Sequence, residues 1–185
     1  MMWDDEWKNV VFSDENKLNL DKPVGFQRYW RDRRRTQETQ YARNFHGGSL
    51  IVWAAFDYNK TSPISFTDHK MSTLRYVELL DSVLIDFAEN FCSENWTFQQ
   101  DNAAIHNTAV TKTFFSQINM CVMKWPAISS DLNHKENLWG ILLGQVYFGG
   151  RQFKSQSDLR RCIESEWRKI PISTLPFLIE SSRDV

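Results

Sequence analysis

The chain has 185 residues, of which 42% are hydrophobic, 14% aromatic and 24% charged, and this composition excludes a disordered polypeptide and predicts a single domain over residues 1–185. Its longest apolar run, residues 50–56, is too short to cross a bilayer, and the N-terminus lacks the order of a signal peptide. We therefore expect a soluble intracellular protein that does not enter a membrane. The formal net charge of −1 does not suit a protein that holds DNA unaided, because such proteins usually carry a clear basic excess.

The first half of the chain has the apolar alternation and the turn residues of a strand-rich region. The candidate strands are residues 9–13, 17–20, 26–30, 49–56 and 64–67. Asp14 directly follows the first of them. Open α/β sheets place ligands at strand ends, which makes Asp14 a candidate site residue. Residues 13–16 taken alone also have the composition of an ordinary turn, so both interpretations stay open.

Positive charge is concentrated in residues 28–35, where basic and aromatic residues mix. The candidate DNA contacts in this segment are Arg31, Arg33, Arg34 and Arg35. A solvated hairpin, with Asp32 as its counter-charge, is the alternative interpretation.

From residue 71 onward the hydrophobic period changes to that of helices. Residues 71–91 predict a helix with one apolar stripe, formed by Leu74, Val77, Leu80, Leu84, Phe87 and Phe91. A strand ending at Asp101, a helix over 105–117 and a short strand over 120–124 follow. Asp101 lies where a strand meets a helix, so it is either a metal ligand or, like Asn102, a helix N-cap.

The last third predicts helices over residues 132–148, 157–169 and 173–182. Strands followed by alternating helix and strand indicate an α/β fold, in which a mixed sheet is flanked by helices. Glu136 lies in the first turn of the first of these helices, where a capping box with Asn133 competes with a role in binding metal.

Asp14, Asp101 and Glu136 together suit a magnesium site. Two carboxylates at strand ends and a third carried by a helix are the hard oxygen ligands that Mg²⁺ takes when it grips a phosphodiester. Phosphoryl transfer on nucleic acid is therefore the leading hypothesis. His106 and Lys135 are further candidates for contacting phosphate, although a lone histidine on a helix is more often structural.

Five segments in a fixed order carry a resemblance to a known family. They are residues 7–15 (WKNVVFSDE), 47–53 (GGSLIVW), 98–103 (FQQDNA), 125–127 (WPA) and 130–139 (SDLNHKENLW). The chain resembles the catalytic domain of a mariner-superfamily transposase of the Tc-type branch, which uses Asp, Asp and Glu. The 34 residues between Asp101 and Glu136, positions 102–135, match the spacing of that branch.

The resemblance implies a ribonuclease-H-like α/β fold in which Asp14, Asp101 and Glu136 hold two Mg²⁺ or Mn²⁺ ions. In that family the ions activate water to cut DNA at transposon ends and then activate the freed 3′ hydroxyl to attack target DNA. The implied partners are therefore transposon ends and target DNA. A homodimer and a location in the nucleus are further expectations.

Departures from the family pattern keep other hypotheses open. Only 13 residues precede Asp14, so we expect the family's N-terminal helix-turn-helix region to be missing, which would also explain the nearly neutral charge. Gly140 and Gly144 predict a softer helix after Glu136, because an interior glycine costs roughly 1 kcal/mol. An inactive or domesticated transposon-derived module, which binds DNA or a partner without catalysis, is the second hypothesis. A general ribonuclease-H-like nuclease is the third.

Overall fold

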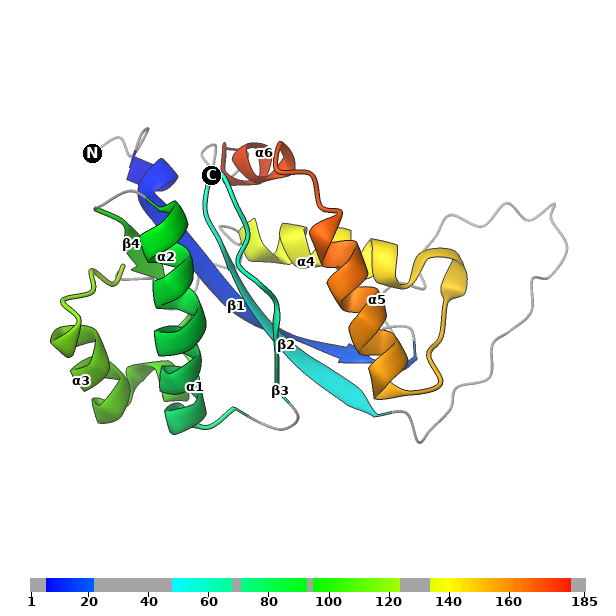
Figure 1. Cartoon of the computed structure of the whole chain (residues 1–185), viewed down its shortest axis with the longest axis horizontal. Helices are drawn as coiled ribbons and strands as arrows, with labels where there is room; N and C mark the ends of the chain where they lie inside the picture. Colours follow the sequence, from blue (N-terminus) through cyan, green and yellow to red (C-terminus); the bar gives the residue numbers. More distant parts are fainter. Residues whose placement is uncertain (1–5, 22–47, 68–70, 93–94, 124–133, 181–185) are drawn as a thin grey trace, which may run out of the picture.

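A mixed sheet forms the centre of the computed structural model, which describes residues 6–21, 48–67, 71–92, 95–123 and 134–180. Within these ranges the sheet has four strands in the order β3-β2-β1-β4 (Figure 1). Strands β1 (Val10–Asn19), β2 (Ser49–Phe56) and β3 (Ser65–Thr67) are antiparallel neighbours. Strand β4 (Thr97–Gln99) runs parallel to β1. The predicted mixed sheet is confirmed.

Strand β1 is longer than the sequence predicts. The expected strands 9–13 and 17–20 form one continuous strand, and the turn expected at residues 13–16 is wrong. The register Asp14↔Ala54 through Asn16↔Val52 keeps these polar residues in the ladder with β2. Pairing with a long buried strand therefore overrides their local turn propensity. The expected strand over residues 26–30 lies outside the described residues.

One face of the sheet is covered by a continuous helical run, made of α1 (Thr73–Leu79), a π-helical segment (Leu80–Ile85) and α2 (Asp86–Phe91). The helix predicted over 71–91 is confirmed. Its buried face begins at Tyr76, whereas Leu74 is 69% exposed, so the expected stripe is wrong at that position. Two residues correspond to about 200° of helical rotation, which turns Leu74 away from the sheet.

The same face carries a 3₁₀ turn (Ala104–Asn107) and helix α3 (Ala109–Gln117). The helix predicted over 105–117 is therefore divided, and Thr108 at the break caps α3 by accepting a hydrogen bond from the Thr111 backbone N–H. In the described part of the expected strand 120–124, only Val122 bridges β4, opposite Phe98.

The other face is covered by α4 (His134–Val146), α5 (Gln156–Arg168) and α6 (Thr174–Glu180). These helices agree with the predicted ranges to within one or two residues wherever the chain is described. Trp139 of α4 stacks on Trp167 of α5 with 5.8 Å between ring centroids. Among the described helices, none is both long and apolar enough to span a bilayer.

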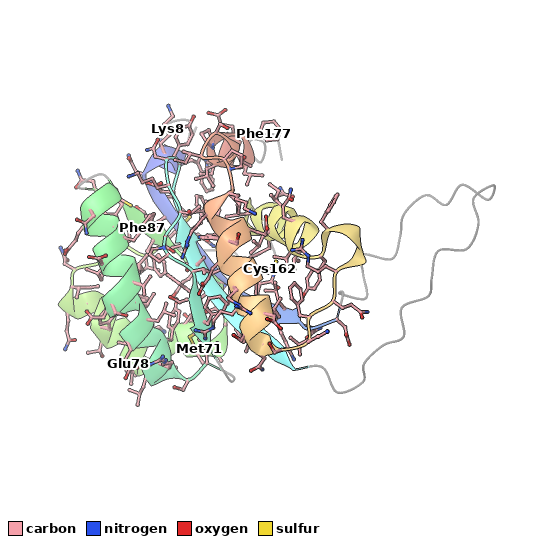
Figure 2. All side chains as sticks on the ribbon, turned by 45° about the vertical axis from the view of Figure 1, so that its right-hand side comes forward. Lys8, Met71, Glu78, Phe87, Cys162 and Phe177 are labelled. Atoms are coloured by element: carbon pink, nitrogen blue, oxygen red, sulfur yellow. The ribbon has the colours of Figure 1, made fainter. Side chains whose placement is uncertain are left out.

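Two hydrophobic cores lie on opposite sides of the sheet. Phe87 of α2 belongs to one, and Cys162 of α5 packs against the other (Figure 2). Successive residues of β1 alternate between them, because Val11 faces the α1–α3 side and Phe12 faces the α4–α6 side. By the same alternation, position 14 faces α4 and position 15 faces α1 and α3.

Candidate active site

Asp14 lies within β1, and Asp101 follows the neighbouring strand β4 by two residues. The parallel register of β1 and β4 ends at Phe12↔Gln99, so each aspartate comes two residues after the last paired residue of its segment. The Ser13 hydroxyl donates to the Gln99 carbonyl at 3.5 Å and links the two strands at this level. The two predicted aspartates therefore lie on neighbouring segments, just beyond the paired part of β1 and β4.

Helix α4 contacts Asp14 directly. The Trp139 indole N–H donates a hydrogen bond to Asp14 Oδ2 at 3.1 Å. Trp139 is 5% exposed and is supported by its stacking on Trp167. Because the acceptor is a carboxylate, this hydrogen bond is of the stronger, charge-assisted kind. It fixes where α4 crosses the part of β1 that carries Asp14.

The third predicted acid, Glu136, belongs to the first turn of α4. Residues three apart share a helix face, so position 136 lies on the face that carries Trp139, about 4.5 Å closer to the start of the helix. The helix therefore carries position 136 on the side that contacts Asp14. The side chains of Lys135 and Glu136 lie outside the described residues.

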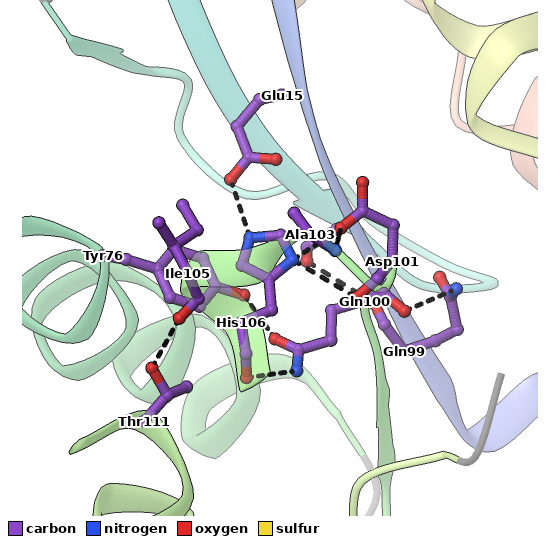
Figure 3. A network of polar contacts seen from close by, with 10 residues as sticks. Glu15, Tyr76, Gln99, Gln100, Asp101, Ala103, Ile105, His106 and Thr111 are labelled. Atoms are coloured by element: carbon purple, nitrogen blue, oxygen red, sulfur yellow. Dashed lines mark hydrogen bonds and ion pairs between the residues drawn. The ribbon is translucent and has the colours of Figure 1, made fainter. Parts of the chain in front are cut away.

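Asp101 is held by two hydrogen-bond donors from its own loop. Its Oδ1 accepts from the Ala103 backbone N–H at 2.8 Å and lies 2.6 Å from His106 Nδ1 (Figure 3). Its side chain is 50% exposed. Thr108 caps α3, so the alternative in which Asp101 or Asn102 caps that helix is wrong. Asp101 instead closes a local turn by accepting a hydrogen bond from the backbone N–H of Ala103, two residues later.

His106 is buried between two carboxylates. Its Nδ1 lies 3.3 Å from the Asp101 carbonyl oxygen, and its Nε2 lies 3.4 Å from Glu15 Oε1. The ring is 3% exposed and stacks at a tilt on Tyr76, with 4.3 Å between centroids. The Asp101 carbonyl and an ionised carboxylate only accept hydrogen bonds, so Nδ1 carries a proton.

The electrostatics of this cluster favour the imidazolium. Burial lowers the pKa of His106, but the hydrogen bonds with Asp101 and Glu15 and their negative charges outweigh it and raise the pKa to about 9. Burial also raises the pKa of Tyr76 well above its ordinary value, and the charges of Glu15 and Asp101 add to this effect. At neutral pH the cluster therefore holds a charged histidine and a neutral tyrosine.

Gln100 connects the tyrosine to the histidine loop. The Tyr76 hydroxyl donates to Gln100 Oε1 at 2.6 Å, and Gln100 Nε2 donates to the His106 carbonyl at 3.4 Å. These contacts tie helix α1 to the loop after β4. The loop that carries Asp101 is thereby fixed to the α1 side of the sheet.

Sequence reasoning missed two residues of the site, Glu15 and Trp139. Strand alternation could have placed Glu15 on the face opposite Asp14, had residues 13–16 not been assigned to a turn. The three-residue spacing of Trp139 from Glu136 was the available signal for a shared helix face. Of the predicted DNA contacts, Arg31, Arg33, Arg34 and Arg35 lie outside the described residues and stay predictions.

The described side chains alone form no cluster of three or more His, Cys, Asp or Glu residues suited to a metal ion. Of the three predicted metal ligands, only Asp14 and Asp101 have described side chains. The side chain of the third, Glu136, lies outside the described residues.

Comparison with known families identifies the family of this chain. Residues 9–160 match the family described as DDE superfamily endonuclease. The chain belongs to that family. The resemblance found in the sequence is therefore confirmed.

The curated relatives are transposases. The chain is 39% identical over 178 residues to the Tc3 transposase of Caenorhabditis elegans, a match that covers 96% of this chain and 54% of the relative. It is 28% identical over 183 residues to the Tcb1 transposase of Caenorhabditis briggsae, covering 95% of this chain and 65% of the relative. The chain thus spans between about half and two thirds of these proteins.

Solved structures of the Mos1 mariner transposase share the fold. The Mos1 paired end complex with Mn has a TM-score of 0.77 at 15% identity, over 96% of this chain and 53% of that one. The separate Mos1 catalytic domain has a TM-score of 0.70 at 13% identity, over 96% of this chain and 78% of that one. The predicted α/β, ribonuclease-H-like fold is confirmed by this likeness.

Proposed function

We propose that this chain is the catalytic domain of a DNA transposase, which cuts DNA strands at transposon ends and joins them to target DNA. The observation that carries the proposal is the position of Asp14 and Asp101, each two residues beyond the paired part of β1 and β4, with α4 bonded to Asp14 through Trp139. Membership of the endonuclease family and the 39% identity to the Tc3 transposase support it.

The proposed metal ligands are Asp14, Asp101 and Glu136, and the proposed cofactor is a pair of Mg²⁺ or Mn²⁺ ions. Carboxylate oxygens fit these hard cations, and two of the three acids come two residues after the last paired residues of β1 and β4. Ions held there would lower the pKa of an attacking water or hydroxyl group and stabilise the leaving oxygen. The fold-related Mos1 complexes contain Mn in one case and Mg in another.

The chain's own contribution is to hold these carboxylates in place before substrate arrives. Trp139 orients Asp14 from α4, whereas the Ala103 N–H and His106 orient Asp101 from its loop. Ligands fixed by such contacts need no rearrangement during the reaction, which is the basis of electrostatic preorganisation.

The proposed partners are transposon ends and target DNA. One fold-related Mos1 structure is a paired-end complex with the left transposon end, and another is a strand transfer complex. Arg31, Arg33, Arg34, Arg35 and Lys135 remain the proposed DNA contacts, whereas His106 is buried with only 3% of its surface exposed. Assembly as a homodimer and a location in the nucleus belong to the same proposal.

A nicking assay on supercoiled plasmid DNA in Mn²⁺ tests the proposal. The wild-type chain should nick the plasmid, and Asp14→Asn, Asp101→Asn and Glu136→Gln should each abolish nicking. Glu164→Gln on α5, outside the site, is the matched control and should retain activity. Calorimetry should show Mn²⁺ binding that the Asp101→Asn variant loses.

Two outcomes favour the other hypotheses. A folded wild-type chain that neither binds Mn²⁺ nor nicks DNA would be an inactive transposon-derived module. Preferential hydrolysis of an RNA/DNA hybrid over duplex DNA would indicate a general ribonuclease-H-like nuclease.

A further inference from the structure

His106 makes a contact to the proposed metal site that simple filling of the core does not require. An apolar ring would fill the space beside Tyr76 equally well, yet this buried ring directs Nδ1 at Asp101 Oδ1, 2.6 Å away. The second ring nitrogen faces Glu15 on the other side. A buried polar ring with carboxylates at both nitrogens is oriented by its hydrogen bonds as well as by its packing.

The ring is held on three sides. Tyr76 stacks on it, Glu15 lies at Nε2, and the His106 backbone N–H bonds to the Ala103 carbonyl at 3.0 Å within the 3₁₀ turn. Glu15 comes from β1, where it pairs with Trp53 of β2. The orientation of the imidazole is therefore set by the sheet, by helix α1 and by its own turn.

A fixed imidazole fixes the carboxylate of Asp101 in turn. The two donors, Ala103 N–H and His106 Nδ1, both bind Oδ1, so they define the plane of a side chain that is otherwise half exposed. The other oxygen of Asp101 points away from the imidazole ring (Figure 3). Partners that orient a metal-binding carboxylate in this way tune metal affinity as well as the shape of the site.

We propose that His106, held in place by Glu15, is a positioning residue that presents Asp101 to the metal ions. The inference rests on the proposed function, because it assumes that Asp101 is a ligand. The two neighbouring acids of β1 would then have different roles. Asp14 would bind metal, whereas Glu15 would act through the imidazole on the other ligand, Asp101. His106 would thus act inside the protein, in place of the DNA contact expected from the sequence.

The test is Mn²⁺ titration of the whole chain, with free Mn²⁺ measured by electron paramagnetic resonance. His106→Ala removes the donor and should raise the Kd for Mn²⁺ by about ten- to a hundredfold. His106→Asn keeps an amide N–H near the position of Nδ1 and should restore most of the affinity. His106→Gln extends its amide towards the position of Nε2 and Glu15, and should restore less.

Thermal unfolding in EDTA accompanies each titration and shows that the variants are folded. Glu15→Gln, which keeps the shape but removes the charge, should weaken Mn²⁺ binding less than His106→Ala does. A merely structural histidine predicts either no change in Kd for the three His106 variants or an equal change in all of them, and either result overturns the proposal. If the wild-type chain does not bind Mn²⁺, both this inference and the proposed function are wrong.

Discussion

Asp14 and Glu15, adjacent carboxylates on opposite faces of β1, have different hydrogen-bond partners. On the α4–α6 side, Asp14 accepts a hydrogen bond from an indole that is itself part of the hydrophobic core. On the α1–α3 side, Glu15 meets a buried imidazole that also binds Asp101. Asp14 thus has a neutral hydrogen-bond donor on one face, whereas Glu15 on the other face has a cationic ring that it shares with Asp101.

This difference shows how a strand can divide roles between adjacent residues. Side chains alternate across the sheet, so adjacent residues of β1 face opposite sides. Asp14 therefore faces the helix that carries Glu136, whereas Glu15 faces the loop that carries Asp101. The proposed ligands are then supported from opposite sides of the sheet. Changes on the two faces should accordingly produce different effects.

The largest contrast is expected between Asp14→Asn and Glu15→Gln. Asp14 is a proposed metal ligand, and the loss of such a ligand removes several kcal/mol of transition-state stabilisation, so Asp14→Asn should slow Mn²⁺-dependent nicking by about a thousandfold or more. Glu15→Gln changes only the support of His106 and should slow nicking by no more than about tenfold. Single-turnover nicking rates at saturating Mn²⁺ measure both. Equal losses in the two variants would contradict the division of roles.

The second prediction concerns pH and the α1–α3 face. The pKa of His106 is raised to about 9 in the folded chain, above its ordinary value of 6.5. Folding therefore favours the protonated ring, and this stabilisation is complete below pH 6.5 and is lost as the pH rises to about 9. In EDTA the free energy of unfolding should fall by up to about 3 kcal/mol over that interval.

Urea unfolding at a series of pH values measures this decline. His106→Asn cannot titrate, so its curve should lack the component between pH 6.5 and 9. A decline of the same size in that variant would assign the effect to other groups.

Some parts of this comparison could be predicted from the sequence. Two apolar strands that each lead into an aspartate predict that Asp14 and Asp101 approach each other, and the register places both of them two residues beyond the paired part of β1 and β4. The contact between Glu15 and His106, 91 residues apart, could not be predicted, because it depends on where the 3₁₀ turn places the imidazole. Local turn propensity at residues 13–16 also hid the continuity of β1, which pairing with β2 enforces.

The contact between Trp139 and Asp14 was beyond sequence reasoning for a different reason. The hydrophobic pattern gives α4 an apolar face, but it does not give the angle at which the helix crosses the sheet. That angle results from the packing of Trp139 on Trp167 and of the neighbouring helices. Tertiary packing thus decides which donor reaches Asp14.

The third prediction concerns the removal of this donor, the Trp139 indole N–H, from the α4–α6 face. Trp139→Phe keeps an aromatic ring against Trp167 but removes the N–H that binds Asp14, and hydrogen bonds to charged groups contribute about 1.5–3 kcal/mol. We expect a loss of about 2 kcal/mol in the free energy of unfolding, together with weaker Mn²⁺ binding. Trp167→Phe is the matched control, since its indole donates to the neutral Ser62 carbonyl at 2.9 Å. It should cost about 1 kcal/mol and leave Mn²⁺ affinity nearly unchanged.

The smallest expected effect comes from a substitution that stiffens α4, the helix that carries Trp139. Nothing lies within 4 Å of a Cβ added at Gly144, and Gly144 is inside α4, so Gly144→Ala should stabilise the chain by about 0.5–1 kcal/mol. Gly149 also has open space around it, but its φ of +68° disfavours any side chain, so Gly149→Ala should destabilise the chain. Chemical denaturation of both variants measures this contrast. If Gly144→Ala raises stability without changing the nicking rate, the softness of α4 is not needed for catalysis; a slower rate would show that α4 must move relative to Asp14 during the reaction.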